Sequence, residues 1–366
     1  MEYVDLKKQY ESYQEEIDLS IKAVLNHGKY IHGPEIERIE KILAEYVGVN
    51  HCVTVSSGTT SLEIALRALS IGPGDEVITV PLTWISSAEV ISLVGAKPVF
   101  VDIDSESFLM NHELLESAIT KQTKAIIPVS LYGQPPKLEE INKIASKYGV
   151  VVIEDAAQSF GALRNDIRSC NLSEIASTSF FPAKPLGCYG DGGALFTNNS
   201  SLADKFRAIR THGAQIRHQH ELIGLNGRFD TIQAAVLLAK FPHFELEIKK
   251  RQEVAQIYSS LLESNFITPA VVDGNTHVYA QYTIRVPSHR REDIMSYMSK
   301  KGVPTGIYYP TCLHLQPAFS ELGYKAGDFP ESERATEEIL SIPMHPFLIN
   351  EEIEFISNNL INALNQ

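Results

Sequence analysis

Short apolar runs alternate with segments of helical period over the first half of the chain. We predict strands in the apolar runs at 52–55, 77–80, 98–103, 125–131, 150–154 and 177–181. Helical spacing of apolar residues predicts helices near 60–70, 84–94, 112–119 and 136–148. Because the strands are almost continuously apolar and alternate with helices, we expect an α/β fold with a mainly parallel sheet covered on both faces.

Two amphipathic helices are predicted before this alternation. The first has apolar residues on one helical face between Ile17 and Leu25, and Gly28 follows as a stop signal. The second begins at Gly33-Pro34 and carries an apolar stripe up to Val47.

The pattern changes towards the C-terminus. Residues 229–263 are typical of two helices broken at Phe241-Pro242. A strand pattern at 277–286, a helix pattern at 290–301 and a closing helix at 351–364 follow. We therefore predict a large domain over 1–244, which includes the N-terminal helices. A connecting helix and a smaller α+β domain are predicted over 245–366.

Composition excludes several classes of partner. Of the 366 residues, 44% are hydrophobic and 21% charged, as in ordinary globular proteins. The net charge of −13 disfavours nucleic acid and acidic membrane surfaces. The N-terminus lacks a signal-peptide core and no apolar stretch reaches the roughly 18 residues of a membrane span, so we expect a cytoplasmic protein. The 4 cysteines are scattered without zinc-like spacing, which predicts no dedicated metal site.

Lys184 has an unusual apolar neighbourhood. Phe180-Phe181 precede it, Pro185-Leu186 follow it, and a glycine-rich turn comes next. A lysine held among apolar groups loses solvation of its charged form, so its pKa falls and the neutral amine can react with a carbonyl. An ordinary solvated surface lysine is the alternative, and local composition leaves both open.

Two further segments carry groups suited to an anionic, heteroaromatic ligand. The turn at 56–61 joins a predicted strand to a helix and is rich in Ser, Thr and Gly, so its N–H groups and hydroxyls can hold a phosphate. A plain helix cap explains the same residues. Asp155 ends a buried strand, where parallel sheets form ligand crevices and a carboxylate can hold a proton on a ring nitrogen. Capping of the next turn is its alternative role.

Trp84, the only tryptophan, follows another predicted strand and can stack on a planar cofactor, although a core or interface position is the usual one. The chain has no G-x-S-x-G motif and no glycine-rich dinucleotide fingerprint. Acyl-transfer hydrolysis and nicotinamide-dependent oxidoreduction are therefore disfavoured.

Taken together, an anion-binding turn, a ring stacker, a strand-end aspartate and a desolvated lysine are the parts that a pyridoxal phosphate site requires. From about Asp5 to the C-terminus the chain resembles the DegT/DnrJ/EryC1/StrS family of nucleotide-sugar aminotransferases. The stretches 154–162 and 179–194, His212-Gly213, and Asn226 with Arg228 and Asp230 carry this resemblance. It implies the aspartate aminotransferase-type fold (fold type I), in which a large domain with a mainly parallel central sheet is joined to a smaller C-terminal domain.

The resemblance also implies the roles of individual residues. Lys184 is the Schiff-base lysine of pyridoxal 5′-phosphate, which becomes pyridoxamine 5′-phosphate during turnover, and Asp155 pairs with the pyridine nitrogen. The other implied cofactor contacts are Gly58, Thr59 and Ser179 to the phosphate, Trp84 and Gln158 to the ring, and Asn226 from a neighbouring subunit. A homodimer with shared active sites follows from the last contact.

The implied substrates are L-glutamate and a UDP-linked oxo-sugar. The sequence segments 127–134 and 168–172 resemble those of the subgroup that aminates C3 of UDP-2-acetamido-2-deoxy-3-oxo-glucose or its uronate. The resemblance implies a ping-pong mechanism. Amination at C3 gives a 2,3-diamino sugar nucleotide for lipopolysaccharide O-antigen synthesis. A 3-oxo or 4-oxo-6-deoxy dTDP- or UDP-sugar is an alternative substrate, and a non-catalytic regulatory protein is an alternative function. A sugar dehydratase is disfavoured because relatives of that kind lack the lysine.

The implied sugar contacts are Arg228, which reaches across the subunit interface, and Tyr308 and Tyr309. Many relatives have His-Tyr-Pro where this chain has Tyr308-Tyr309-Pro310, so we consider the nearby His314 as a replacement for that histidine. Arg217, His218 and His220 are candidates for binding a C6 carboxylate, with a solvated loop as the alternative.

Overall fold

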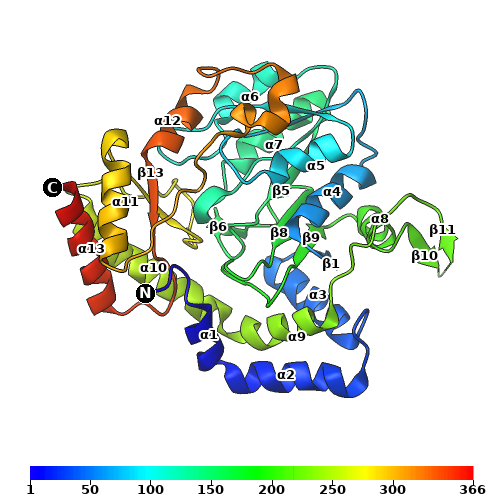
Figure 1. Ribbon diagram of the computed structural model, residues 1–366. Coiled ribbons are helices and arrows are strands. Elements are labelled where there is room, and N and C mark those ends of the chain that lie inside the picture. Colours follow the sequence, from blue (N-terminus) through cyan, green and yellow to red (C-terminus); the bar gives the residue numbers. More distant parts are fainter. Residues whose placement is uncertain (217, 366) are drawn as a thin grey trace.

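A seven-stranded sheet forms the centre of the computed structural model, which describes residues 1–216 and 218–365 (Figure 1). The strand order is β1-β9-β8-β5-β4-β2-β3. The strands are β1 (His51–Val55), β2 (Glu76–Thr79), β3 (Lys97–Phe100), β4 (Thr123–Ile126), β5 (Val151–Asp155), β8 (Ile175–Ser179) and β9 (Gly193–Thr197). Every neighbouring pair from β8 to β3 is parallel, whereas β9 runs antiparallel to both β8 and β1. The predicted fold class, α/β with a mainly parallel sheet, is confirmed.

Helices cover both faces of this sheet. One face packs against α4 (Gly58–Ala68), α5 (Ser86–Leu93) and α8 (Ser200–Arg210). The other packs against α3 (Pro34–Val47), α6 (His112–Ala118), α7 (Leu138–Tyr148) and α9 (Thr231–Lys240). Successive strand residues point to opposite faces, so Val77 packs with α4 and α5 while Ile78 packs with α6 and α7. Burial on both faces is why these strands are continuously apolar.

A second core lies in the C-terminal part of the chain. Its elements are α10 (Phe244–Leu262), β12 (Tyr282–Arg285), α11 (Arg291–Lys300), β13 (Ile339–Ile342) and α13 (Asn350–Leu364). Helix α12 (Pro330–Glu338) precedes β13 and packs through Ala335 into the core that contains α6 and α7. The antiparallel pair β12–β13 packs against α10, α11 and α13 around buried residues such as Tyr258 and Tyr282. The helical break expected at Phe241-Pro242 lies between α9 and α10. The domain boundary near residue 245 remains a prediction.

The remaining elements are short. Helices α1 (Leu6–Ser12) and α2 (Gln14–His27) form the N-terminal segment, and α2 runs beside α9 (Figure 1). One small hairpin consists of β6 (Leu163–Arg164) and β7 (Ile167–Arg168), and another of β10 (Ala214–Ile216) and β11 (Gln219–His220). The β10–β11 hairpin projects from the body of the molecule, at the right of Figure 1.

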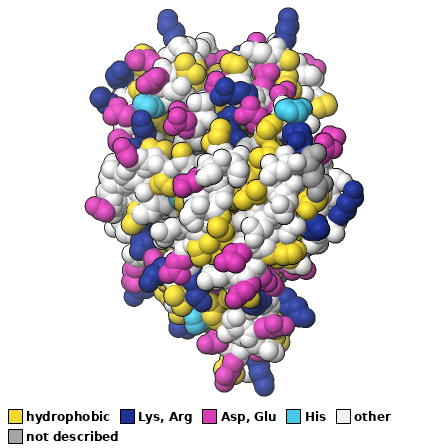
Figure 2. All heavy atoms as spheres, turned by 90° about the vertical axis from the view of Figure 1, so that its left-hand side faces the viewer, with side chains coloured by type: hydrophobic (Ala, Val, Ile, Leu, Met, Phe, Trp, Pro, Cys, Tyr) yellow, Lys and Arg dark blue, Asp and Glu magenta, His cyan; other side chains and the backbone are white. Residues whose placement is uncertain are grey.

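The charged side chains are of both signs on the face formed by the C-terminal helices. Figure 2 shows Lys and Arg interspersed there with Asp and Glu. Among the described residues, no helix combines the length and apolar character needed to cross a membrane.

The carboxyl ends of the parallel strands gather the residues singled out from the sequence. Ser57 caps the helix that follows β1, Asp155 ends β5 and Ser179 ends β8. Trp84 lies in the connection from β2 to α5. Since these strands run in the same direction, their ends meet at one edge of the sheet, which is where α/β proteins bind ligands.

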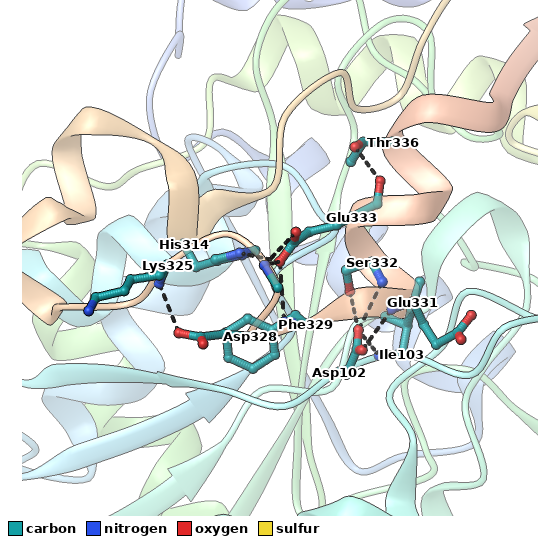
Figure 3. Close-up of polar contacts among 11 residues, drawn as sticks. Asp102, Ile103, His314, Lys325, Asp328, Phe329, Glu331, Ser332, Glu333 and Thr336 are labelled. Carbon is teal, nitrogen blue, oxygen red and sulfur yellow. Dashed lines mark hydrogen bonds and ion pairs between the residues drawn. The ribbon is translucent and has the colours of Figure 1, made fainter. Parts of the chain in front are cut away.

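A buried carboxylate joins this sheet to the C-terminal segment. Asp102, which follows β3, accepts hydrogen bonds from the backbone N–H groups of Glu331 and Ser332, each at 2.9 Å, and from the Ser332 hydroxyl at 2.6 Å (Figure 3). Both N–H groups belong to the first turn of α12, which has no intrahelical partner for them. Asp102 therefore caps a helix more than 200 residues away in sequence.

We predict that Asp102→Ala destabilises the protein by about 2 kcal/mol or more, because it leaves buried N–H groups of α12 without an acceptor. Equilibrium denaturation in urea measures this change. The exposed Glu321 provides the matched control, since Glu321→Ala should change the free energy of unfolding by less than about 0.5 kcal/mol. Equal effects of the two substitutions would contradict the capping role.

Candidate functional site

A cavity of about 430 Å³ opens at the carboxyl edge of the sheet. Most of the site residues expected from the sequence line it: Gly58, Thr59, Trp84, Asp155, Gln158, Ser179, Lys184, Tyr308 and Tyr309. They come from five separate segments of the chain, which the fold brings together. The cavity is therefore the candidate active site.

The N-terminus of α4 forms one end of the cavity. The Ser57 hydroxyl accepts a hydrogen bond from the Thr60 N–H at 3.0 Å, and the Thr59 hydroxyl lies 2.6 Å from that of Ser86. Gly58 approaches Ser179 so closely that a Cβ on Gly58 would lie 2.8 Å from the Cβ of Ser179. Glycine is required for this approach, which leaves a concave cradle of N–H groups and hydroxyls for a phosphate at the positive end of the helix dipole.

Asp155 forms the floor of the cavity. Its carboxylate accepts hydrogen bonds from the Ser87 hydroxyl at 2.8 Å and from the Ala157 N–H at 3.2 Å. Burial raises the pKa of Asp155, against the opposing effects of these two hydrogen bonds and of the Lys184 ammonium. A buried carboxylate of this kind suits a positively charged ring nitrogen.

Lys184 faces this carboxylate across the cavity. Its side chain is half-buried and lines the cavity. Desolvation lowers the pKa of Lys184 from 10.5 to about 8, although the charge of Asp155 acts in the opposite direction. The structure thus favours the desolvated amine over the solvated surface lysine that the sequence left open.

Gln158 and two aromatic residues complete the wall. The Gln158 side-chain oxygen accepts the Tyr132 N–H at 2.8 Å, and its amide nitrogen lies 3.4 Å from the Tyr309 hydroxyl. Trp84 is 58% exposed and its ring centroid lies 5.7 Å from that of Tyr309. Trp84 is therefore not a core residue of this chain, and its ring is free to cover a planar ligand.

Asn226 and Arg228 do not line the cavity of their own chain within the described residues. They are neighbours on the segment before α9, where the Arg228 guanidinium donates to the Asn226 side chain at 3.1 Å. This position agrees with their expected role towards a neighbouring subunit, which stays a prediction. Of the candidates for a C6 carboxylate, Arg217 lies outside the described residues, while His218 and His220 are exposed.

His314 is buried away from the cavity. Its Nε2 lies 3.1 Å from the Glu333 carboxylate, and its ring packs 4.7 Å from that of Phe329 (Figure 3). The side chain has no exposed surface. The expectation that His314 contacts the substrate finds no support here, because the Glu333 carboxylate and aromatic rings enclose it.

Several cavity residues were missed from the sequence, among them Ser87, Tyr3 and Gln281. Ser87 belongs to the segment of Trp84 and follows β2 at the same sheet edge, so its position was an available signal. Tyr3 and Gln281 also line the cavity, and the Tyr3 ring lies 5.7 Å from that of Tyr308. Tyr3 and Gln281 lie far apart in the sequence, so no local pattern connects them.

Comparison with known proteins identifies the family. The model of the DegT/DnrJ/EryC1/StrS aminotransferase family matches residues 11–361. The chain belongs to this family. A UDP-2-acetamido-2-deoxy-3-oxo-D-glucuronate aminotransferase from Pseudomonas aeruginosa is 49% identical over 363 residues, which are 99% of this chain and 100% of that protein.

Solved structures agree with this assignment. A DegT/DnrJ/EryC1/StrS aminotransferase from Brucella abortus has a TM-score of 0.96 and 39% identity, with 100% of each chain covered. NtdA from Bacillus subtilis, solved with the bound cofactor PMP, has a TM-score of 0.91 and 31% identity, with 97% of this chain and 82% of that chain covered. The present protein is a pyridoxal phosphate-dependent aminotransferase of fold type I. The cradle at Gly58 and the buried carboxylate of Asp155 fit this cofactor.

We predict that cofactor-free protein couples covalently to pyridoxal phosphate at a rate that rises with pH through a midpoint of about 8, because only the neutral Lys184 amine reacts. Borohydride trapping followed by mass spectrometry of the Lys184 peptide measures the rate. Asp155→Asn should move the midpoint to lower pH, because the Asp155 charge raises the pKa of Lys184. A midpoint near 10.5 in the unaltered protein would show that Lys184 is solvated.

Proposed function

We propose that this aminotransferase moves an amino group from L-glutamate to the ketone of UDP-2-acetamido-2-deoxy-3-oxo-glucose or its uronate. The product is a 2,3-diamino sugar nucleotide. The end-to-end identity of 49% with the Pseudomonas aeruginosa enzyme carries the proposal. A second relative, 38% identical over 362 residues, is a UDP-N-acetyl-3-dehydro-alpha-D-glucosamine 3-aminotransferase from Acidithiobacillus ferrooxidans, and supports the same sugar class.

In this proposal Lys184 and Asp155 perform the proton chemistry. Pyridoxal phosphate, when bound, withdraws electrons from the donor Cα and carries the amino group between the two substrates. The neutral Lys184 amine removes the proton from the glutamate Cα and later returns a proton to the sugar carbon that receives nitrogen. The Asp155 carboxylate keeps the proton on the pyridine nitrogen, and the Ser87 hydroxyl and Ala157 N–H hold that carboxylate in place.

The other cavity residues bind and orient. Gly58, Thr59 and Ser179 would hold the phosphate at the α4 N-terminus, where the positive end of the helix dipole would attract its charge. The Gln158 amide nitrogen, which lies 3.4 Å from the Tyr309 hydroxyl, would donate to the ring hydroxyl. The exposed Trp84 would stack on the ring.

Tyr308 and Tyr309 line the cavity, and we assign the sugar to this wall. The Tyr132 hydroxyl donates to the Tyr308 carbonyl and so fixes this wall to the large domain. A tyrosine at position 308 offers a hydroxyl where a histidine offers an imidazole, so it contributes no positive charge towards a C6 carboxylate. Such a charge must then come from Arg228 or from the segment that contains His218.

A homodimer with shared active sites is part of the same proposal. The β10–β11 hairpin and the segment after it project from the body of the chain (Figure 1) and expose apolar side chains, with Ile216 60% and Ile223 86% exposed. Exposed apolar groups on a projecting arm favour contact with another chain. Asn226 and Arg228 follow this arm and would enter the cavity of the partner subunit. A cytoplasmic location, expected from the sequence, and a role in lipopolysaccharide O-antigen synthesis, implied by the family resemblance, complete the proposal.

The substrate class is tested with a panel of ketosugars. Purified protein is first converted with L-glutamate, which should bleach the cofactor absorbance and release 2-oxoglutarate in an amount equal to the sites. The converted protein is then offered UDP-3-oxo-N-acetylglucosamine, its uronate and a 4-oxo-6-deoxy sugar nucleotide. We expect only the 3-oxo sugars to restore the absorbance and yield an amine detectable by mass spectrometry.

Lys184→Ala serves as the control and should fail in both half-reactions. Preference for the 4-oxo-6-deoxy sugar would replace the proposed substrate class while leaving the aminotransferase intact. Absence of conversion by glutamate would remove the proposed donor.

Mixing two inactive variants tests the shared site. Lys184→Ala and Arg228→Ala each disable every site of their own homodimers. A mixed dimer regains one complete site, in which Lys184 comes from one chain and Arg228 from the other. Random 1:1 mixing should therefore give roughly a quarter of the unaltered activity, since half of the dimers are mixed and half of their sites are complete. Activity no greater than the mean of the two separate variants would show that Arg228 serves its own chain.

A further inference from the structure

Helix α9 supplies side chains that hydrogen-bond to the turn after Lys184, residues 185–190. The Gln233 side-chain oxygen accepts the Tyr189 N–H at 2.8 Å, and its amide nitrogen donates to the Tyr189 carbonyl at 3.2 Å. One side chain thus satisfies both polar backbone groups of a turn residue. One face of α9 packs into the same core as α3, so Gln233 projects from a fixed support.

A buried lysine makes a second contact with the same turn. Lys240, at the end of α9, is 3% exposed, and its ammonium donates a hydrogen bond to the Gly187 carbonyl. The ammonium also lies 5.4 Å from the centroid of the Tyr189 ring. Burial lowers the pKa of Lys240 to about 8, opposed by the charges of Glu247 and Cys188, while Arg251 acts in the same direction as burial.

The ammonium of Lys240 has a buried carboxylate, Glu247, and a buried guanidinium, Arg251, near it. The Glu247 carboxylate raises the pKa of Lys240 and also accepts the Gln9 amide nitrogen at 3.0 and 2.9 Å. Burying a charged group is costly unless it makes compensating polar contacts. An ammonium at this position therefore needs a reason beyond packing, and its contact with the Gly187 carbonyl supplies one.

The turn itself is built for backbone contact. A Cβ on Gly187 would lie 2.4 Å from the Pro182 carbonyl oxygen, and a Cβ on Gly190 would lie 2.9 Å from the Gln233 amide nitrogen. The Lys184 N–H donates to the Phe181 carbonyl at 2.8 Å inside this closed loop. Buried Leu186 and Cys188 anchor the middle of the turn in the core, and α9 supplies the side-chain hydrogen bonds to Gly187 and Tyr189.

We propose that Lys240 and Gln233 are positioning residues that hold the turn so that the Lys184 amine stays desolvated in the cavity, facing Asp155. The inference rests on the proposed role of Lys184 as the reacting amine. Neither residue lines the cavity, so they act on the reaction only through the placement of Lys184.

The test uses cofactor-free protein. Lys240→Met and Gln233→Leu keep the volume of the side chain and remove its hydrogen bonds to the turn. Competitive labelling with acetic anhydride across the pH range, with the Lys184 peptide quantified by mass spectrometry, gives the midpoint at which this amine becomes reactive. We expect about 8 in the unaltered protein. In each variant the midpoint should rise by about one pH unit, because a released turn exposes Lys184 to water.

Turnover provides a second readout. We expect kcat to fall about tenfold in each variant with KM for glutamate unchanged, because the substrate contacts remain. Lys249→Met, at an exposed lysine of α10, is the matched control and should match the unaltered protein in both measurements. Thermal unfolding establishes whether each variant is folded. If Lys240→Met does not fold, the labelling midpoint and kcat of Gln233→Leu alone test the proposal.

Folded variants with the midpoint and kcat of the unaltered protein would overturn the proposal. The labelling needs neither cofactor nor substrate. A failure of the proposed sugar specificity therefore leaves this result interpretable, and a failure of the positioning role leaves the sugar panel unaffected.

Discussion

The direction of the strands in the central sheet determines where the chemistry can occur. Strands β1, β2, β5 and β8 point the same way, so the segments that follow them meet at one edge although they are far apart in sequence. The anion cradle, the ring stacker, the carboxylate and the lysine are each attached to a strand end or to the segment after it. The local sequence gives each group the chemistry that the cofactor needs. The common direction of the strands brings the groups together in a single site.

Burial then adjusts two charged groups in opposite ways. Desolvation disfavours the charged form of each, so the pKa of Asp155 rises and that of Lys184 falls, while their mutual attraction limits both shifts. The lowered pKa of Lys184 leaves more of its amine in the neutral form near neutral pH. Perturbed groups of this kind reduce stability and are retained where they serve a reaction.

The strands were predictable because burial on both faces leaves a strong apolar signal, as in the run that ends at Asp155. The strand β9 was not predicted, since its glycine-rich start resembles the preceding turn. Among the cavity residues, Lys184 and Asp155 could be named as candidates from local composition and strand position, although each had an alternative role. Gln158 required the family resemblance, and Tyr3 required the three-dimensional contact with Tyr308. The prediction for His314 relied on its closeness in sequence to Tyr308, which does not determine the direction of a side chain in a short helical segment.

The reversed direction of β9 has a consequence for the segment that carries Lys184. Ser179 at the end of β8 pairs directly with Gly193 at the start of β9, and the Phe180 N–H donates to the Gly192 carbonyl at 2.8 Å. Residues 180–192 are therefore closed into a ring by the sheet, whereas a parallel neighbour would have required a long crossover. Such a ring has a fixed circumference. An inserted or deleted residue would have to be accommodated within this closed segment. The length of the segment therefore sets how far the Lys184 amine extends into the cavity and how much space remains there for the sugar.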